Sequence, residues 1–235
     1  MKPMPEDWAS AVAVVAHPDD LEYGAASAVA RWTRQGKRVS YLLATRGEAG
    51  IAAMAPPQTG PLRVREEERS AAVVGVSHVE FLDYQDGVVE YGLGLRRDLA
   101  AAFRRLRPDV VVTMSFDLTW GEDEGPVNHA DHRAVGLAVL DACRDATNEW
   151  VFPDAGPPCP PISAAYVIAS GTPTHFVDVT DTIDLGIASL REHQAYIQGL
   201  GGEFDPDEFL RSMAGYVGLG AGCDYAVSMR RYPMS

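Results

Sequence analysis

Histidine and aspartate side chains follow directly on an apolar run near the start of the chain. Residues 12–16 are apolar, and His17-Pro18-Asp19-Asp20 comes next. The run predicts a buried strand, which we expect to end here because Pro18 cannot donate a hydrogen bond to a neighbouring strand. Imidazole nitrogens and carboxylate oxygens are ligands for Zn²⁺. The cluster predicts a metal site at the carboxyl end of a strand, and the alternative that Asp19 or Asp20 only caps a helix stays open.

A second pair of histidines, His129 and His132, stands three residues apart at the start of a predicted helix. Both side chains can project from one side of its first turn, so one can bind a metal while the other faces a bound substrate. His17, Asp20 and His132 form a set of two histidines and one aspartate, which leaves positions for water and substrate. Asp19 then remains as a free carboxylate beside the metal-bound water, where a general base is needed.

Asp131 lies between these two histidines in the sequence. One interpretation is that it supports a metal-binding imidazole from outside the ligand set. The other is that its negative charge stabilises the N-terminus of the predicted helix.

Three further polar residues could reach the same place. Glu48 follows the second apolar run and Asp86 follows the third. Because the carboxyl ends of parallel strands meet at one edge of a sheet, these side chains are expected to converge with the first cluster. Both could equally be solvated turn residues. Arg65 lies in the charged run Arg65-Glu66-Glu67-Glu68-Arg69, which by itself indicates only a solvated helix face.

Apolar runs and helical periodicity alternate along the chain. Strands are expected at residues 12–16, 39–44, 79–82, 110–114, 166–169 and 225–229. Helices are expected at residues 25–35, 62–74, 96–106, 129–142, 183–200 and 207–216. This alternation predicts a single α/β domain over residues 1–235, a Rossmann-like three-layer sandwich with a mostly parallel sheet covered on both faces.

Composition narrows the classes of partner. The formal net charge is −13, which argues against a nucleic acid or an anionic membrane surface as partner. No apolar run is long enough to span a bilayer, and the acidic first ten residues do not resemble a signal peptide, so a cytoplasmic location is expected. Three widely spaced cysteines predict neither a disulfide framework nor a cysteine zinc site. A homo-oligomer is compatible with the sequence.

The motifs together resemble a known family. They are Ala16-His17-Pro18-Asp19-Asp20-x-Glu22, Thr45-Arg46-Gly47-Glu48, Arg65-x-x-Glu68, Asp86-Gly87 and His129-x-Asp131-His132. In this order they are similar to the LmbE-like, or PIG-L, zinc-dependent N-deacetylases, which act on N-acetylglucosaminyl inositols, bacillithiol precursors, chitobiose and some glycosylated antibiotics. The resemblance implies hydrolysis of an N-acyl amino sugar, most simply an N-acetylglucosaminide, as a small-molecule substrate.

Site roles follow from this resemblance. It implies that His17, Asp20 and His132 bind zinc, that Asp19 is the general base, and that His129 stabilises the oxyanion in protonated form. It assigns sugar contacts to Glu48, Arg65 and Asp86. Either Asp19 or His129 could protonate the leaving amine. The same ligands also fit Fe²⁺ and Co²⁺, so the identity of the metal stays open.

The chain also departs from the family pattern. Val127 stands where some relatives have a tyrosine, and the segment 117–124 is unusually acidic. His193 only loosely matches a late family motif, because Ala195 and Tyr196 replace its last two residues.

Two other functions remain to be weighed. A metallophosphoesterase would also use clustered His and Asp, but it would need more ligands and a basic cluster beyond Arg46 and Arg65. A catalytically inactive sugar-binding homologue would have no need to keep Asp19 beside a full ligand set.

Overall fold

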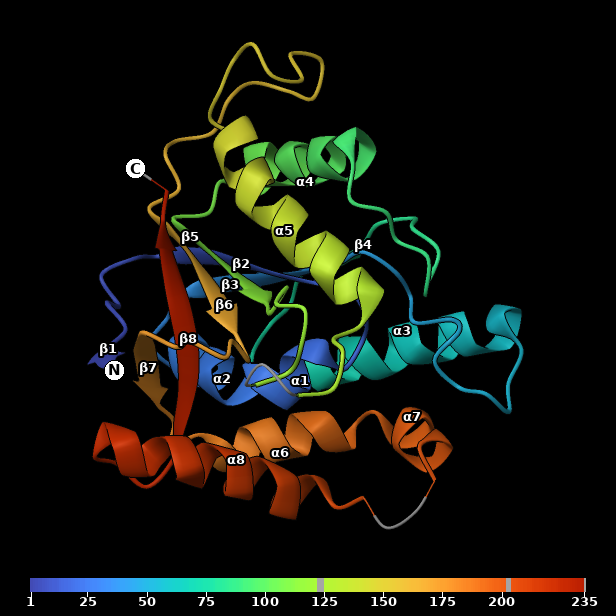
Figure 1. The fold of residues 1–235 in the computed structure, drawn as a ribbon, viewed down its shortest axis with the longest axis vertical. Coiled ribbons are helices and arrows are strands. Elements are labelled where there is room, and N and C mark those ends of the chain that lie inside the picture. The colour runs from blue at the N-terminus through green and yellow to red at the C-terminus, as the bar shows by residue number, and fades with distance from the viewer. Residues whose placement is uncertain (122–124, 202–203, 235) are drawn as a thin grey trace.

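The described residues, 1–121, 125–201 and 204–234 of the computed structural model, contain eight strands in one continuous sheet (Figure 1). The order is β1-β7-β8-β6-β5-β2-β3-β4. The strands are Lys2–Pro3 (β1), Ser10–Val15 (β2), Arg38–Leu43 (β3), Val79–Phe81 (β4), Val110–Met114 (β5), Ala164–Ile168 (β6), His175–Asp178 (β7) and Ala226–Pro233 (β8). Only β8 pairs antiparallel with its neighbours, β6 and β7. The prediction of a mostly parallel α/β sheet is therefore confirmed.

Helices cover both faces of this sheet (Figure 1). They are Asp20–Gly24 (α1), Ala26–Arg34 (α2), Pro56–Val73 (α3), Leu93–Leu106 (α4), Ala130–Asp145 (α5), Ile183–Arg191 (α6), Gln194–Gly199 (α7) and Pro206–Ala221 (α8). Helices α4 and α5 lie on one face, and α1, α2 and α3 lie on the other. Helix α6 packs against α2, α8 packs against α6 and β8, and α7 packs against α3, so this face carries an additional helical layer.

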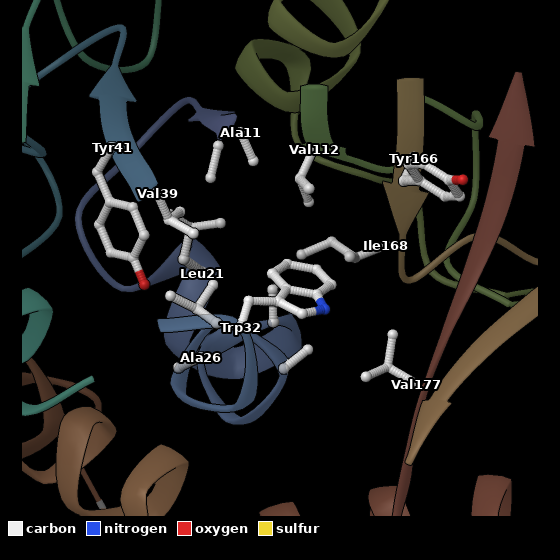
Figure 2. Packing of buried hydrophobic residues seen from close by; sticks show 14 of the residues in the cluster. Ala11, Leu21, Ala26, Trp32, Val39, Tyr41, Val112, Tyr166, Ile168 and Val177 are labelled. Carbon is white, nitrogen blue, oxygen red and sulfur yellow. The ribbon is translucent and has the colours of Figure 1, made fainter. Parts of the chain in front are cut away.

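The strand that leads to the first cluster is buried on both sides, as the continuous apolar run of β2 requires. Alternate β2 side chains enter two different cores. Ala13 packs into the core that contains Trp32 of α2, and Val14 packs into the core that contains Phe103 of α4. Figure 2 shows the Trp32 ring beneath the sheet, beside Ile168 at the end of β6. The end of β2 is thus fixed from both faces.

Three helices differ from expectation in ways that matter for the site. The helix expected at 25–35 is preceded by the short α1, so Asp20 begins a helix instead of lying in a loop. Helix α3 starts six residues before the expected residue 62, because prolines are tolerated in the first turn, where backbone N–H groups have no partner within the helix. The helix expected at 183–200 is two helices, α6 and α7, interrupted at Glu192 and His193.

The strands β1, β7 and β8, which form one side of the sheet, were harder to predict. The short strands β1 and β7 were not expected, and β8 runs four residues beyond the expected end at 229. Strand β7 pairs with the two-residue β1 on one side and with β8 on the other, and its burial is partial, so its sequence lacks a strong apolar run. Within the described part of the chain, no helix combines the length and the apolar character needed to cross a membrane.

The topology creates one switch point. Strand β2 has β3 on one side and β5 on the other, so the connections after β2 and β5 leave toward opposite directions of the sheet. Ligands of open α/β sheets bind in the crevice outside the carboxyl ends of such a strand pair. Here the segment after β2 carries His17, Asp19 and Asp20. The start of α5, which follows β5 in the chain, carries His129 and His132.

Candidate active site

A cavity of about 490 Å³ opens at this switch point. Its polar wall brings together residues from four different segments of the chain. They are His17, Asp19, Asp20, Arg63, Asp86, His129 and His132. Most of the predicted site residues therefore do converge on this cavity. The exceptions are Glu48, Arg65 and Asp131, which do not line it.

Two imidazole nitrogens and one carboxylate oxygen face one another in this wall. His132 Nε2 lies 3.1 Å from His17 Nδ1 and 3.1 Å from Asp20 Oδ1. The other Asp20 oxygen, Oδ2, lies 3.6 Å from His17 Nδ1. Ligands bound tetrahedrally to zinc at its usual distances are separated by about 3.3 Å. The donor types and their spacing therefore fit one divalent metal ion of the zinc type.

The outer atoms of the same three side chains are held in place. His132 Nδ1 is 3.0 Å from Asn128 Oδ1, and His17 Nε2 is 3.1 Å from Asp131 Oδ2. Asp20 Oδ2 accepts hydrogen bonds from the backbone N–H groups of Ala16 and His17. Such contacts set the ring tautomers and aim the donor atoms at the metal. Asn128 is a residue that the sequence analysis missed, since nothing in its local pattern marks it.

Asp131 itself is fully buried and bound on both oxygens. Its carboxylate accepts backbone hydrogen bonds from Gly87 at 2.7 Å and from Val89 at 3.0 Å, besides the contact with His17. It therefore ties the segment after β4 to the first turn of α5, and it orients the His17 ring. A support outside the ligand set would make such contacts, and this role of Asp131 stays a prediction.

Charge also distinguishes the two neighbouring aspartates. Burial alone would raise the pKa of the Asp20 carboxyl, but the adjacent His132 and His17 imidazoles hold that pKa far below its ordinary value. For Asp19, burial raises the pKa to about 6 in spite of the nearby Arg63 guanidinium. Asp20 is thus the stronger candidate for a permanently ionised ligand, and Asp19 is the carboxyl whose affinity for a proton is raised.

The backbone of Asp19 adopts an uncommon conformation. Its φ is 92°, in the left-handed region that side chains other than Gly rarely occupy. Its N–H donates to Glu67 Oε2 at 3.3 Å, and its Oδ1 is paired with Arg63 Nη2 at 2.9 Å. These contacts hold the turn between β2 and α1, and they place the Asp19 carboxylate on the cavity wall beside the metal donors.

Arg63, and not Arg65, is the arginine of this site. Arg63 is buried, and it also donates to the carbonyls of Gly47 and Pro18. Arg65 is exposed and does not line the cavity. Residues two apart on a helix point about 200° away from each other, so only one of the two can face the site. Because α3 begins earlier than expected, its inward face could not be assigned from the charge pattern.

Gly47 makes this position of Arg63 attainable. Its φ is 62°, and a Cβ atom there would collide with the Arg63 guanidinium. A glycine therefore serves both the turn after β3 and the close approach of the arginine.

Glu48 and Asp86 are linked to each other. The Asp86 N–H donates to Glu48 Oε1 at 2.9 Å, and Asp86 Oδ2 accepts from the Ala49 N–H at 2.8 Å. Asp86 Oδ1 lies 3.0 Å from His17 Nε2 and lines the cavity. Glu48 does not line the cavity, so its expected direct contact with a sugar is not supported; its carboxylate accepts from the backbone of Asp86 instead.

His129 forms the outer edge of the polar wall. Its ring centroid is 4.9 Å from that of His17 and 5.2 Å from that of His132. Its Nδ1 accepts a hydrogen bond from the Asp131 N–H at 3.2 Å, so this nitrogen carries no proton. The neutral ring then bears its proton on Nε2. Burial and the neighbouring His17 and His132 lower the pKa of His129, which favours this neutral form.

Behind Asp19 lies a second buried polar group. His193 Nε2 is 3.6 Å from both Glu22 Oε2 and Glu67 Oε2, and all three side chains are excluded from solvent. Although burial opposes it, the contact with Glu22 raises the pKa of His193, while burial and the charge of Glu22 raise that of Glu67. Their ligand atoms lie close enough for a cation, but an imidazolium between two carboxylates satisfies the charges equally well.

Replacing His193 by Ala is expected to lower the free energy of unfolding by about 3–5 kcal/mol, because it leaves two buried carboxylates without a positive neighbour. Denaturant unfolding followed by circular dichroism measures this loss. The exposed His78 provides the control: its alanine variant should stay within about 0.5 kcal/mol of the parent. A loss for His193→Ala as small as that of the control would contradict the ionic interpretation of this cluster.

Two departures from the family pattern lie near the site. Val127 is 69% exposed and does not line the cavity, whereas Tyr23 and Tyr196 do. In the acidic segment, Asp117 accepts a hydrogen bond from Ser115 Oγ at 3.1 Å. Residues 122–124 of that segment lie outside the described residues.

Fold and site together define a class: α/β proteins that hold one His-Asp-His metal-donor set at the switch point of a mostly parallel sheet. The family model described as PIG-L, GlcNAc-PI de-N-acetylase, matches residues 12–143. The chain therefore belongs to the PIG-L family, as its motifs indicated.

Individual proteins of this kind are similar over most of the chain. A diacetylchitobiose deacetylase of Thermococcus kodakarensis is 28% identical over 92% of this chain and 80% of its own length. A 1D-myo-inositol 2-acetamido-2-deoxy-alpha-D-glucopyranoside deacetylase of Kineococcus radiotolerans is 29% identical over 78% of this chain and 68% of its own length. The structure of N,N'-diacetylchitobiose deacetylase from Pyrococcus horikoshii superposes with a TM-score of 0.86 at 25% identity, covering 97% of this chain and 85% of that chain.

Proposed function

We propose that this protein is a metal-dependent hydrolase that removes the N-acyl group from a small N-acetylglucosamine-containing compound. The observation that carries the proposal is the donor set of His17, Asp20 and His132 with the Asp19 carboxylate directly beside it. Similarity to deacetylases of chitobiose and of a glucosaminyl inositol supports the substrate class. Zn²⁺ suits these ligands best, and Fe²⁺ and Co²⁺ also fit them.

Sugar recognition falls to polar side chains that line the cavity. Asp86 and Arg63 offer an acceptor and a donor on the polar wall. Glu48 acts on the sugar only through the backbone of Asp86, which it holds. Because hydroxyl groups need partners when they lose water, these side chains are suited to orient an amino sugar.

A bound zinc ion would lower the pKa of water from its bulk value to about 7 and polarise the acyl carbonyl. Asp19 accepts the proton of the attacking water. As the acyl oxygen gains negative charge, His129 donates a hydrogen bond to it from Nε2–H. The C–N bond then breaks, and the proton held by Asp19 passes to the departing amine.

We assign protonation of the leaving amine to Asp19, and not to His129, because of the tautomer of His129. Its Nδ1 accepts from the Asp131 N–H, so the neutral ring has a single proton, on Nε2, which is available to an acyl oxygen. A donor in that state stabilises charge without giving its proton away. His129 need not be an imidazolium, which revises the role that the resemblance implied.

Replacing His129 by Ala is expected to lower kcat by about 10²–10³-fold, the usual cost of one oxyanion donor, and to leave the metal content unchanged. Steady-state kinetics and elemental analysis of the same preparation measure the two quantities. The His129→Gln variant is a matched test because its amide can still donate, so it should recover part of the loss. Loss of metal in either variant would make His129 a metal ligand.

The proposal is tested by primary-amine release from a panel of N-acetylglucosaminyl compounds, run beside generic phosphate esters. Amine release without phosphate release supports the deacetylase. Phosphate release alone would favour a metallophosphoesterase, for which the cavity wall offers a single arginine, Arg63. Binding of the sugars without either reaction would favour an inactive sugar-binding protein.

A further inference from the structure

The cavity has a second wall that the proposed reaction does not use. It is formed mainly by apolar and aromatic side chains from α1, from the segments after β5 and β6, and from α8. Among them are Tyr23, Trp120, Ile168, Phe209 and Met213. Tyr23 and Phe209 touch edge to face, with ring centroids 5.5 Å apart, and Trp120 packs against the His132 ring. This wall therefore begins directly beside a metal donor.

The apolar wall continues into a smaller cavity of about 100 Å³ between α1 and α8. The two cavities share Tyr23, Gly24, Ala169 and Met213. The far end is lined mostly by short apolar side chains of α1, α6, α8 and β8. They include Ala25, Ile183, Leu210, Ala214 and Val217. Because they share these residues the two cavities adjoin, and together they are called here the α1–α8 groove.

One charged residue, Glu22, also lines the far end of this groove. Its carboxylate is already engaged, because Oε1 accepts from Ser70 Oγ at 2.6 Å and Oε2 faces His193. Glu22 is 1% exposed. The surface that the α1–α8 groove offers to a ligand is thus apolar, with Ser27 and Ser228 as its other polar members.

The position of the α1–α8 groove beside a metal donor suggests what occupies it. In a trans amide, the sugar carbon and the acyl chain lie on opposite sides of the C–N bond. The reacting acyl carbon lies at the metal donors, and Trp120 of the apolar wall packs against His132, so an acyl chain that continues from this carbon meets the apolar wall. The methyl group of an acetyl substituent would reach only the start of this wall, and apolar surface of this extent in a cleft indicates a ligand-binding role.

We propose that the α1–α8 groove binds the alkyl chain of an N-acyl group longer than acetyl. This inference rests on the proposed function and names its substrate class: an N-alkanoyl glucosamine. Water adds its oxygen to the acyl carbon, the C–N bond breaks, and the products are an alkanoate and a free amine that takes up the proton.

The first test is a chain-length series of N-acetyl-, N-butanoyl-, N-hexanoyl- and N-octanoylglucosamine. We expect kcat/KM to rise about fourfold for each methylene group that the groove buries, which corresponds to ~0.8 kcal/mol. A flat or falling series would overturn the inference. So would a rise confined to N-acetylglucosaminides with alkyl aglycones, since this would place the apolar group on the other side of the amide.

A second measurement is independent of turnover. Binding of the free alkanoates, acetate to octanoate, followed by calorimetry, should tighten with chain length. If no sugar is deacylated and octanoate still binds more tightly than acetate, the proposed function fails and the α1–α8 groove stands. If N-acetylglucosaminides are deacetylated and neither series depends on chain length, the function stands and the groove inference fails.

Two variants on α8 test whether the dependence on chain length arises in the α1–α8 groove. Met213 lines both cavities and is 55% exposed, so Met213→Asp places a charge in the groove without burying it in the core. Tyr216→Asp places the same charge one turn away, at a residue that is 80% exposed and lines neither cavity. Met213→Asp should reduce the octanoyl-to-acetyl ratio of kcat/KM by at least tenfold, and Tyr216→Asp should keep it. Equal effects of both variants would contradict binding in the groove.

Discussion

Replacing Asp19 by Asn is expected to lower kcat by about 10²–10⁴-fold, the range for loss of a general base, while the protein binds its metal as before. The amide has the same shape as the carboxylate and can still accept the hydrogen bond of Arg63 Nη2, which now lies 2.9 Å from Oδ1. It cannot take a proton from the attacking water. Amine release and elemental analysis of the same preparation measure activity and metal.

Asp83→Asn is the matched control for this variant. Asp83 lies after β4, its side chain is 91% exposed, and it pairs only with Arg46 across the surface. Its replacement should leave kcat unchanged. Near-normal turnover in Asp19→Asn would remove Asp19 from the mechanism, and loss of metal in that variant would make Asp19 a ligand.

Replacing His132 by Ala is expected to remove the metal and with it the activity. His132 Nε2 is within 3.1 Å of both His17 Nδ1 and Asp20 Oδ1, so it is the donor that links the other two. Loss of a partner outside the ligand set typically costs about 10–100-fold in metal affinity, and loss of a ligand should exceed this. Competition with a chromogenic chelator measures the affinity.

The Asn128→Ala variant distinguishes the loss of a metal ligand from the loss of a residue that orients a ligand. Asn128 holds His132 Nδ1 at 3.0 Å without facing the metal donors, so its replacement should weaken metal binding by less than His132→Ala does. The exposed His78→Ala variant should bind metal as the parent does. Retention of full metal affinity in His132→Ala would show that the ion is bound elsewhere, for instance by the cluster of Glu22, Glu67 and His193.

Part of the polar wall could be predicted because its residues follow strands closely. A strand end is marked in the sequence by the change from apolar to polar residues, and the topology of a parallel sheet then gathers these ends at one edge. His17 and Asp20 follow β2 in this way, whereas His132 lies within α5 and was predicted from its spacing to His129. The fold class was predicted from the alternation of apolar runs and helical periodicity, and the family from the resemblance of the motifs; both are confirmed.

Residues that reach the site from within helices could not be identified in this way. Whether Arg63 or Arg65 faces inward depends on where α3 starts, and the prolines that begin it resemble a loop in the sequence. The interruption between α6 and α7 was hidden by continuous helical periodicity, although it is the feature that buries His193. The apolar wall was missed because Tyr23, Phe209 and Met213 resemble ordinary core residues until tertiary packing brings them to the cavity.

The most direct test is a zinc titration of the metal-free protein, followed by amine release from an N-acetylglucosaminyl substrate. We predict that activity appears in proportion to bound zinc and saturates at one ion per chain, and that the His132→Ala variant gains none. Amine release that is independent of added metal, or that needs two ions per chain, would contradict a single metal site formed by His17, Asp20 and His132.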